Sequence, residues 1–132
     1  MLLLQDVQGN DVSRERNQSS QLKWLGICDV DDLSPNAGIC ALVADRQVAI
    51  FYFPDTGDIY ALDNYDPFGH ANVIFRGITG DINGQAVVAS PLYKQHFILE
   101  SGQCVEDESV QLTHYPVHIV GDTVEIAVPA HN

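Results

Sequence analysis

The sequence predicts an all-β domain, and three observations favour this fold class. Short runs of β-branched and aromatic residues recur along the chain from Trp24 onward. Turn signals separate these runs, above all Pro54-Asp55-Thr56-Gly57 and the hairpin dipeptide Asn83-Gly84. No long stretch keeps the 3.6-residue hydrophobic period of a helix. Many short strands with regular turns are typical of antiparallel sheets that form a sandwich or a barrel.

The expected strands are the apolar runs that end at a turn or a loop. Ser34-Pro35-Asn36 forms the turn before the second strand, and Asp45-Arg46 separates the second strand from the third. Gly121-Asp122 joins the last two strands, while Asp29–Leu33 fits a single helical turn. In chain order the strands are Lys23–Cys28, Gly38–Val43, Gln47–Phe53, Ile59–Leu62, Gly80–Ile82, Gln85–Ala89, His96–Leu99, Tyr115–Val120 and Thr123–Val128.

Composition and charge limit the classes of function. With 132 residues, of which 45% are hydrophobic, the chain has the size of one domain and can bury a core without disulfides. Eighteen acidic residues against six basic ones give a net charge of −12. This charge argues against nucleic acid and anionic membrane surfaces as partners, because both are bound through clustered Lys and Arg. An acidic surface is compatible with a basic protein partner.

The N-terminal segment has the features of a tail and not those of a targeting signal. Residues 1–20 are mostly polar and have no period, so we expect a flexible tail followed by a β domain over residues 21–132. The apolar start Met1–Leu4 stops at Gln5 and is too short for the core of a signal peptide. No run is long enough to span a bilayer, and we therefore expect a cytoplasmic protein.

The three cysteines, Cys28, Cys40 and Cys104, are widely spaced and form no Cys-x-x-Cys pair. The usual zinc and thioredoxin patterns are therefore absent, and reduced thiols in the cytosol are the expected state. Cys40 lies within the apolar run Ile39–Val43 and is expected to be a small core residue. A reactive thiol is the alternative for any of the three.

Two segments interrupt the strand pattern and combine Pro or Gly with aromatic and polar residues. They are the first loop, Asn64–His70, and the second loop, Ser90–Gln95, and each directly follows an expected strand. Loops on a rigid β scaffold commonly carry function. The alternative is that both are plain connections whose Pro and Gly only satisfy the backbone geometry.

From Trp24 to Val128 the sequence resembles the Rieske iron–sulfur domain family. The resemblance rests on the two loops, on the Asn83-Gly84 hairpin, and on a C-terminal pattern, Phe97-x-Leu99-x-x-Gly102 with Tyr115-Pro116-Val117-x-Ile119-x-Gly121-Asp122-x-Val124. It implies antiparallel sheets, or a barrel, with two projecting loops. Rieske domains bind a two-iron cluster with Cys-x-His in the first loop and Cys-x-x-His in the second.

This sequence departs from the family pattern at all four ligand positions. Asp66 and Phe68 replace the Cys and His of the first loop, and Ser90 and Tyr93 replace those of the second. Phe68 has no ligand atom, a serine hydroxyl is a poor substitute for a thiolate, and a neutral tyrosine is a poor ligand. We therefore expect a Rieske-like domain that binds no cluster, metal or other cofactor and has no catalytic residue.

A Rieske-like domain without ligands is similar to the small-subunit family of assimilatory NAD(P)H-dependent nitrite reductases. The most specific matches are Gly38–Val43, Gln47–Phe51, Asp66-Pro67-Phe68, and Ala89–Leu92 followed by Lys94-Gln95-x-Phe97. The resemblance implies a heteromeric cytoplasmic enzyme that reduces nitrite to ammonium in nitrate assimilation. Its large subunit would carry FAD, an iron–sulfur cluster and siroheme and would receive electrons from NADH. This chain would bind and support that subunit.

The tips of the two loops are the expected docking face for the large subunit. Rigid apolar and aromatic area suits interface anchors, and polar groups suit the rim. The expected anchors are Pro67, Phe68, Pro91 and Tyr93, and the expected rim residues are Asp66, His70 and Lys94. Internal packing of Phe68 and Tyr93, in the space that a cluster would fill, is the alternative.

Three other interpretations stay open. His70, His96 and Asp66 could form a mononuclear metal site near the loop tips. The chain could be a stand-alone Rieske-type electron carrier with unusual ligands, or an acidic β module that binds an unrelated partner.

We expect Glu106-Asp107-Glu108 to be a solvated loop, with a docking patch for a basic partner as the alternative.

Deletion of residues 1–20 should shift the thermal midpoint by no more than about one or two degrees, because a polar tail contributes little to the free energy of folding. Melting curves of the full and shortened chains, followed by circular dichroism, test this expectation. A fall of many degrees would show that the segment packs on the domain.

Overall fold

The structure of the protein is a computed structural model that describes residues 22–129. The expected tail over residues 1–20 lies outside the described residues. The described chain consists mainly of antiparallel strands, which confirms the predicted all-β class. Within these residues the helical elements are two single turns, η2 (Val30–Asp32) and η3 (Ile74–Arg76). No helix in this part of the chain is long and apolar enough to cross a membrane.

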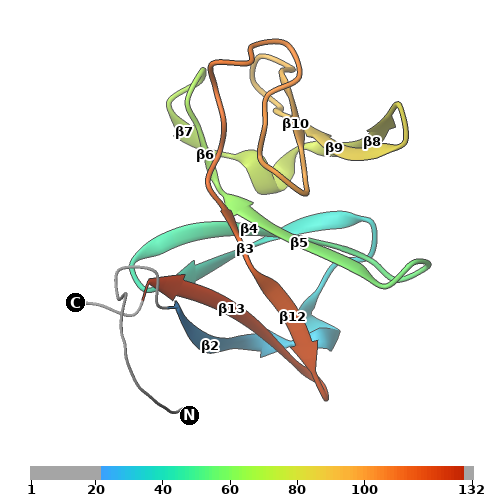
Figure 1. Ribbon diagram of the computed structural model, residues 1–132, viewed down its shortest axis with the longest axis vertical. Coiled ribbons are helices and arrows are strands. Elements are labelled where there is room, and N and C mark those ends of the chain that lie inside the picture. The colour runs from blue at the N-terminus through green and yellow to red at the C-terminus, as the bar shows by residue number, and fades with distance from the viewer. Residues whose placement is uncertain (1–21, 130–132) are drawn as a thin grey trace, which may run out of the picture.

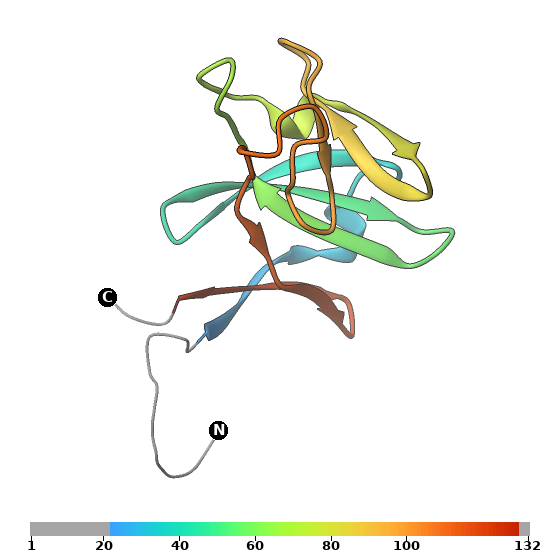
Figure 2. The same cartoon turned by 45° about the horizontal axis from the view of Figure 1, so that its top comes forward.

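The strands stack in three layers, and the middle layer is a four-stranded sheet (Figure 1). Its order is β11-β5-β4-β3, and each neighbouring pair is antiparallel. The other two layers cover its opposite faces, as the views in Figures 1 and 2 both show. The four strands are β3 (Ala37–Val43), β4 (Arg46–Phe53), β5 (Asp58–Asp63) and β11 (His114–Tyr115).

Strand β4 is buried on both faces and joins the two hydrophobic cores. Val48 and Ile50 belong to one core, whereas Ala49 and Phe51 belong to the other. All four side chains are at most 1% exposed. Alternate side chains of a strand point to opposite faces, so a strand between two layers requires a continuous apolar run.

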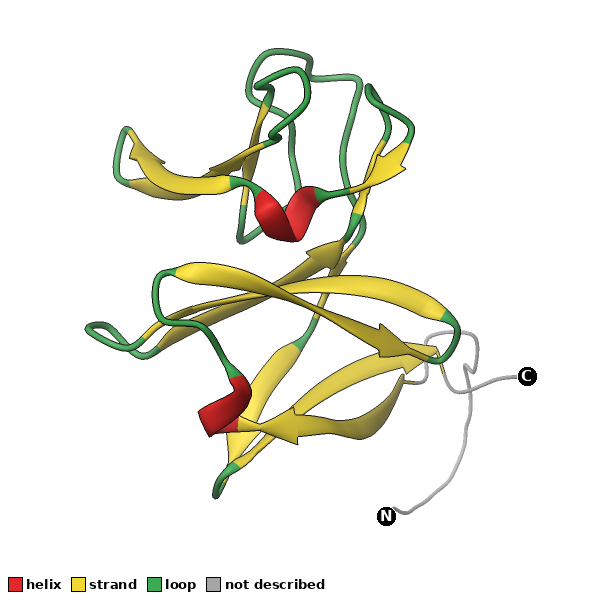
Figure 3. Ribbon diagram, turned by 180° about the vertical axis from the view of Figure 1, so that it is seen from behind, coloured by secondary structure: helices red, strands yellow, loops and turns green. Residues whose placement is uncertain are grey.

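The lower layer is a three-stranded sheet of β2 (Leu22–Asp29), β12 (Val117–Val120) and β13 (Thr123–Pro129), in the order β12-β13-β2. Val124, Ile126 and Val128 of β13 face the middle sheet and build the first core. Leu22 pairs with Pro129, so the two ends of the described chain lie side by side in this layer. Figures 1 and 3 show this layer on the far side of the middle sheet from the loops.

The upper layer carries both loops (Figures 1 and 2). It contains the β10-β9-β8 sheet and a short β6-β7 hairpin, and it closes the second core over Phe51. The Asn83-Gly84 turn has φ angles of 53° and 85°, as a two-residue hairpin with two left-handed residues requires. The strands are β6 (Tyr65–Asp66), β7 (Ala71–Asn72), β8 (Ile78–Ile82), β9 (Gln85–Ala89) and β10 (His96–Ile98).

The predicted strands are confirmed to within one residue at most of their ends. The turn expected at Asp45-Arg46 lies at Ala44-Asp45, which have φ angles of 49° and 69°, and Arg46 is the first residue of β4. Three further differences have larger effects. The expected strand Tyr115–Val120 is divided at Pro116, because proline has no N–H to donate to the ladder. The first loop contains β6, which pairs with β7 directly after the loop, and both strands are too short to give a periodic signal. The third difference is that the strand expected at Gly80 begins at Ile78. The helical turn expected in Asp29–Leu33 is η2.

Replacing Phe51 with alanine should lower the free energy of unfolding by about 3–5 kcal/mol, because it leaves a cavity between two layers that cannot close around it. Urea denaturation measures this loss. The half-buried Phe53 of the same strand provides the matched control, and Phe53→Ala should cost clearly less. Equal losses would contradict the burial of β4 between two cores.

Candidate functional site

Asn64 anchors the base of the first loop, a role that the sequence analysis did not assign. Its side chain is fully buried. Nδ2 donates to the Asn72 carbonyl at 3.1 Å and to Gln47 Oε1 at 3.3 Å, and Oδ1 accepts the Phe75 amide at 2.8 Å. These bonds tie the β6-β7 hairpin to β4 and η3. One Asn in a loop gives no sequence signal for such a role, because its partners are set by the tertiary fold.

Asp66 and Ser90 lie in contact between the two loops. Both residues are buried, with exposed fractions of 0% and 1%. The Ser90 hydroxyl donates a hydrogen bond to Asp66 Oδ2. Asp66 Oδ1 accepts the backbone N–H groups of Phe68 at 2.8 Å and Gly69 at 3.2 Å. The carboxyl group is therefore partnered by donors from both loops, as burial of such a group requires.

The position of Asp66 differs from the rim contact that the sequence analysis expected. A rim residue needs exposed surface, and the Asp66 side chain has none in the described chain. Its carboxyl group is needed inside the domain, because the turn of the first loop leaves two backbone N–H groups that require an acceptor. An Asx turn of this kind is common, but the sequence does not show that a second loop closes over it.

The two aromatic residues that the family resemblance matches to ligand positions have different environments. Phe68 is half-buried and packs on the second core, with its ring centroid 6.3 Å from that of Phe97. Tyr93 is 63% exposed, and the adjacent Leu92 is 46% exposed. Phe68 thus contributes to internal packing, whereas Leu92 and Tyr93 present apolar area to solvent.

The expected rim residues His70 and Lys94 are exposed, and both have positive φ angles, 54° and 68°. His70 Nδ1 lies 3.1 Å from the Tyr65 hydroxyl. Pro67 is half-buried, and Pro91 is exposed. The loop tips therefore bring six of the seven expected docking residues to surface or half-buried positions, and only Asp66 is fully buried.

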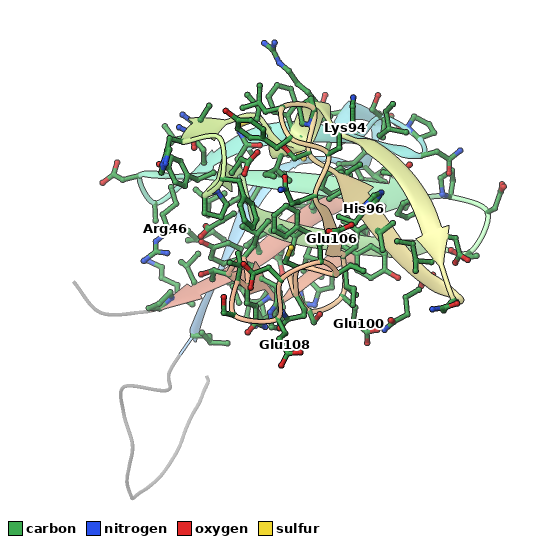
Figure 4. The ribbon with its side chains drawn as sticks, turned by 90° about the horizontal axis from the view of Figure 1, so that it is seen from above. Arg46, Lys94, His96, Glu100, Glu106 and Glu108 are labelled. Atoms are coloured by element: carbon green, nitrogen blue, oxygen red, sulfur yellow. The ribbon has the colours of Figure 1, made fainter. Side chains whose placement is uncertain are left out.

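His96 belongs to a separate pair beside the loops (Figure 4). Its backbone N–H donates to Glu106 Oε1 at 2.8 Å, and its Nδ1 lies 2.6 Å from Glu106 Oε2. Partial burial alone would raise the pKa of the Glu106 carboxyl, but the bonds to His96 hold that pKa below its ordinary value. In the same view Lys94 lies well apart from Glu100 and Glu108.

The structure does not assemble the mononuclear metal site considered from the sequence. His70, His96 and Asp66 contact three different partners, namely Tyr65, Glu106 and Ser90. Over residues 22–129, no group of three or more His, Cys, Asp or Glu side chains is placed to hold a metal ion.

The four ligand positions do not fit a two-iron cluster. The Asp66 and Ser90 side chains are joined by a direct hydrogen bond, so they already partner each other across the two loops. At Gly69 the loops approach so closely that an added Cβ would lie 2.4 Å from Leu92 Cδ1. Phe68 supplies no ligand atom, and none of the four residues is a thiolate or an imidazole, the ligands that such clusters take.

The cysteines lie outside the loops, and the expectation that Cys40 is a core residue is wrong. Ile39 and Ala41 pack on the first core, so the side chain between them points to the other face of edge strand β3, where it is exposed. Cys104 is the buried thiol. Desolvation raises the pKa of all three thiols above the ordinary value, which disfavours a reactive thiolate.

The family model of the Rieske-like [2Fe-2S] domain matches residues 23–127. The nitrite reductase (NADH) small subunit of Escherichia coli K12 is 40% identical over 104 residues, which cover 79% of this chain and 96% of that protein. The chain belongs to the small-subunit family of NADH-dependent nitrite reductases. The solution structure of the Escherichia coli protein NirD has a TM-score of 0.75 at 39% identity, covering 82% of this chain and 98% of that one. These findings confirm the fold and the family inferred from the loops.

Another relative contains a similar domain within a longer chain. The nitrite reductase [NAD(P)H] large subunit of Klebsiella oxytoca includes a segment that is 42% identical to 96 residues of this chain. The match covers 73% of this chain and 10% of that protein. A domain of this small-subunit family thus occurs both as a separate chain and as part of a large subunit.

Anaerobic reconstitution with iron and sulfide should leave this chain without a two-iron cluster, because Asp66 and Ser90 partner each other and Phe68 has no ligand atom. Visible absorption and paramagnetic resonance spectra measure the outcome. A Rieske ferredoxin treated in parallel controls for the reconstitution itself. A stoichiometric Rieske-type signal from this chain would contradict the expectation that these residues hold no cluster.

Proposed function

We propose that this chain is the cofactor-free small subunit of a cytoplasmic NADH-dependent nitrite reductase and docks on the large subunit through its loop tips. The family resemblance implies that the large subunit carries FAD, an iron–sulfur cluster and siroheme. That subunit passes electrons from NADH to nitrite, which is reduced to ammonium. The small subunit binds and supports it and supplies no catalytic residue.

The exposed apolar area at the loop tips is the observation that carries the docking proposal. The Leu92 and Tyr93 side chains are adjacent and exposed on a loop whose base is closed by the Ser90 N–H bond to the Gln95 carbonyl and joined to the first loop through Asp66. Aromatic and aliphatic area of this kind is unfavourable in water and favourable in an interface, where tyrosine is a common anchor. The exposed Pro91 and Lys94 flank these anchors in the chain, and the exposed His70 follows Gly69, which lies against Leu92.

The names of the relatives, and the place of a similar domain within one of them, favour the large subunit as the partner. The relatives from Escherichia coli and Salmonella are named small subunits, a name that implies a larger one. The Klebsiella oxytoca relative carries a similar domain within a large subunit. A domain that occurs both fused to a protein and as its separate subunit is expected to work in contact with that protein.

The positions of the two ends of the described chain are compatible with docking through the loop tips. Leu22 and Pro129 pair in the lower layer, whereas the loops project from the upper layer (Figures 1 and 3). The two ends of the described chain therefore lie on the side away from the loops.

Replacing Tyr93 with aspartate should weaken binding to the large subunit by about a hundredfold, because a carboxylate without a partner would be buried in an apolar contact. Titration calorimetry on the purified pair measures the affinity. The free domain should keep its stability, since Tyr93 is 63% exposed. Phe68→Asp is expected to weaken binding and also to destabilise the domain, because Phe68 packs on the second core.

Val120→Asp is the matched control, because Val120 is 54% exposed in the lower layer, away from the loops. It should leave the affinity unchanged. Wild-type affinity for Tyr93→Asp would contradict docking through the loop tips, and the acidic run Glu106-Asp107-Glu108 would then be the next surface to test.

A further inference from the structure

We propose that the buried Asp66–Ser90 contact is a positioning device that holds the two loops in the arrangement that the partner recognises. This inference rests on the proposed docking function and names residues that cannot themselves touch the partner. Asp66 and Ser90 are 0% and 1% exposed. Any effect of these residues on docking must therefore act through the loops they hold.

In the first loop, Asp66 fixes the turn that carries Phe68 and Gly69. One carboxylate oxygen accepts both of their backbone N–H groups, at 2.8 and 3.2 Å. The Asp66 carbonyl accepts the His70 N–H at 2.7 Å. One residue thus holds the turn from Asp66 to His70, including the rim residue His70.

In the second loop, Ser90 has the equivalent role. Its N–H donates to the Gln95 carbonyl at 2.8 Å, and its carbonyl accepts the Lys94 N–H at 3.1 Å. Its hydroxyl oxygen accepts the Leu92 N–H at 3.3 Å. Ser90 therefore closes the loop that displays Leu92, Tyr93 and Lys94.

The hydrogen bond from Ser90 to Asp66 joins these two local networks into one. Packing supports the connection, because Gly69 of the first loop lies against Leu92 of the second. A displacement of either loop would leave a buried carboxyl or hydroxyl group without its partner, which is costly. The two tips consequently form one preorganised surface, and preorganised surfaces lose less conformational entropy on binding.

Ser90→Ala should weaken docking on the large subunit by about tenfold, because one buried hydrogen bond is lost and the loops gain freedom. Asp66→Asn should retain most of the affinity, because its Oδ1 still accepts the two amides and its Nδ2 can donate to the Ser90 hydroxyl. Asp66→Ala combined with Ser90→Ala should cost little more than Asp66→Ala alone, as expected for partners in one contact.

The control for general destabilisation is Ile126→Val, which removes one methyl group from the first core, away from the loops. It should leave affinity unchanged. Amide hydrogen exchange in the free variants supplies a second readout. Ser90→Ala should speed exchange at Phe68, Gly69 and Leu92, whereas Ile126→Val should not.

The outcomes separate this inference from the proposed function. If Tyr93→Asp weakens binding but Ser90→Ala leaves it unchanged, the loop tips dock and the positioning role is wrong. If Tyr93→Asp has no effect, docking is elsewhere and both proposals are wrong. Should Ser90→Ala fail to fold, Gly69→Ala gives the test instead, because its added Cβ would lie 2.4 Å from Leu92 Cδ1 and displace the second loop. Unchanged affinity in that variant would also overturn the positioning role.

Discussion

The buried contact between Asp66 and Ser90 is the constraint on which the loop end of this protein depends. A carboxyl group without exposed surface must be satisfied by donors nearby, and here the donors come from both loops. In Rieske domains, thiolates and imidazoles of the same two loops are joined through iron. This chain joins the loops through hydrogen bonds. The two loops of this fold can thus be held together without iron when their buried side chains satisfy one another.

The rest of the fold provides a rigid support for that contact. Strand β4 is buried on both faces and fixes the middle sheet between two cores. Asn64 connects this sheet to the first loop through its bonds to Gln47, Asn72 and Phe75. Phe68 packs on the second core beside Phe97. The loop that the partner would recognise is therefore held from beneath by apolar packing and from the side by polar contacts.

The sequence predicted the local features of this structure better than the contacts between distant segments. Turn chemistry placed the Asn83-Gly84 hairpin, and apolar runs located the main strands. The role of Asp66 could not be predicted, because its partner Ser90 is 24 residues away and only the fold brings them together. The prediction for Cys40 is wrong because the residue lies in an apolar run on an edge strand, where one face is only partly covered. The likeness of the loops to a known family supplied the function, which periodicity alone did not contain.

The central claim is that the loop end faces the large subunit. Amide hydrogen exchange of this chain, measured alone and in complex with the large subunit, tests this claim most directly. The account predicts slower exchange in the complex at Leu92, Tyr93 and His70, with no change on the outer face of the lower sheet, for example at Trp24 and Val120. Protection of the lower sheet with unchanged exchange in both loops would contradict the account.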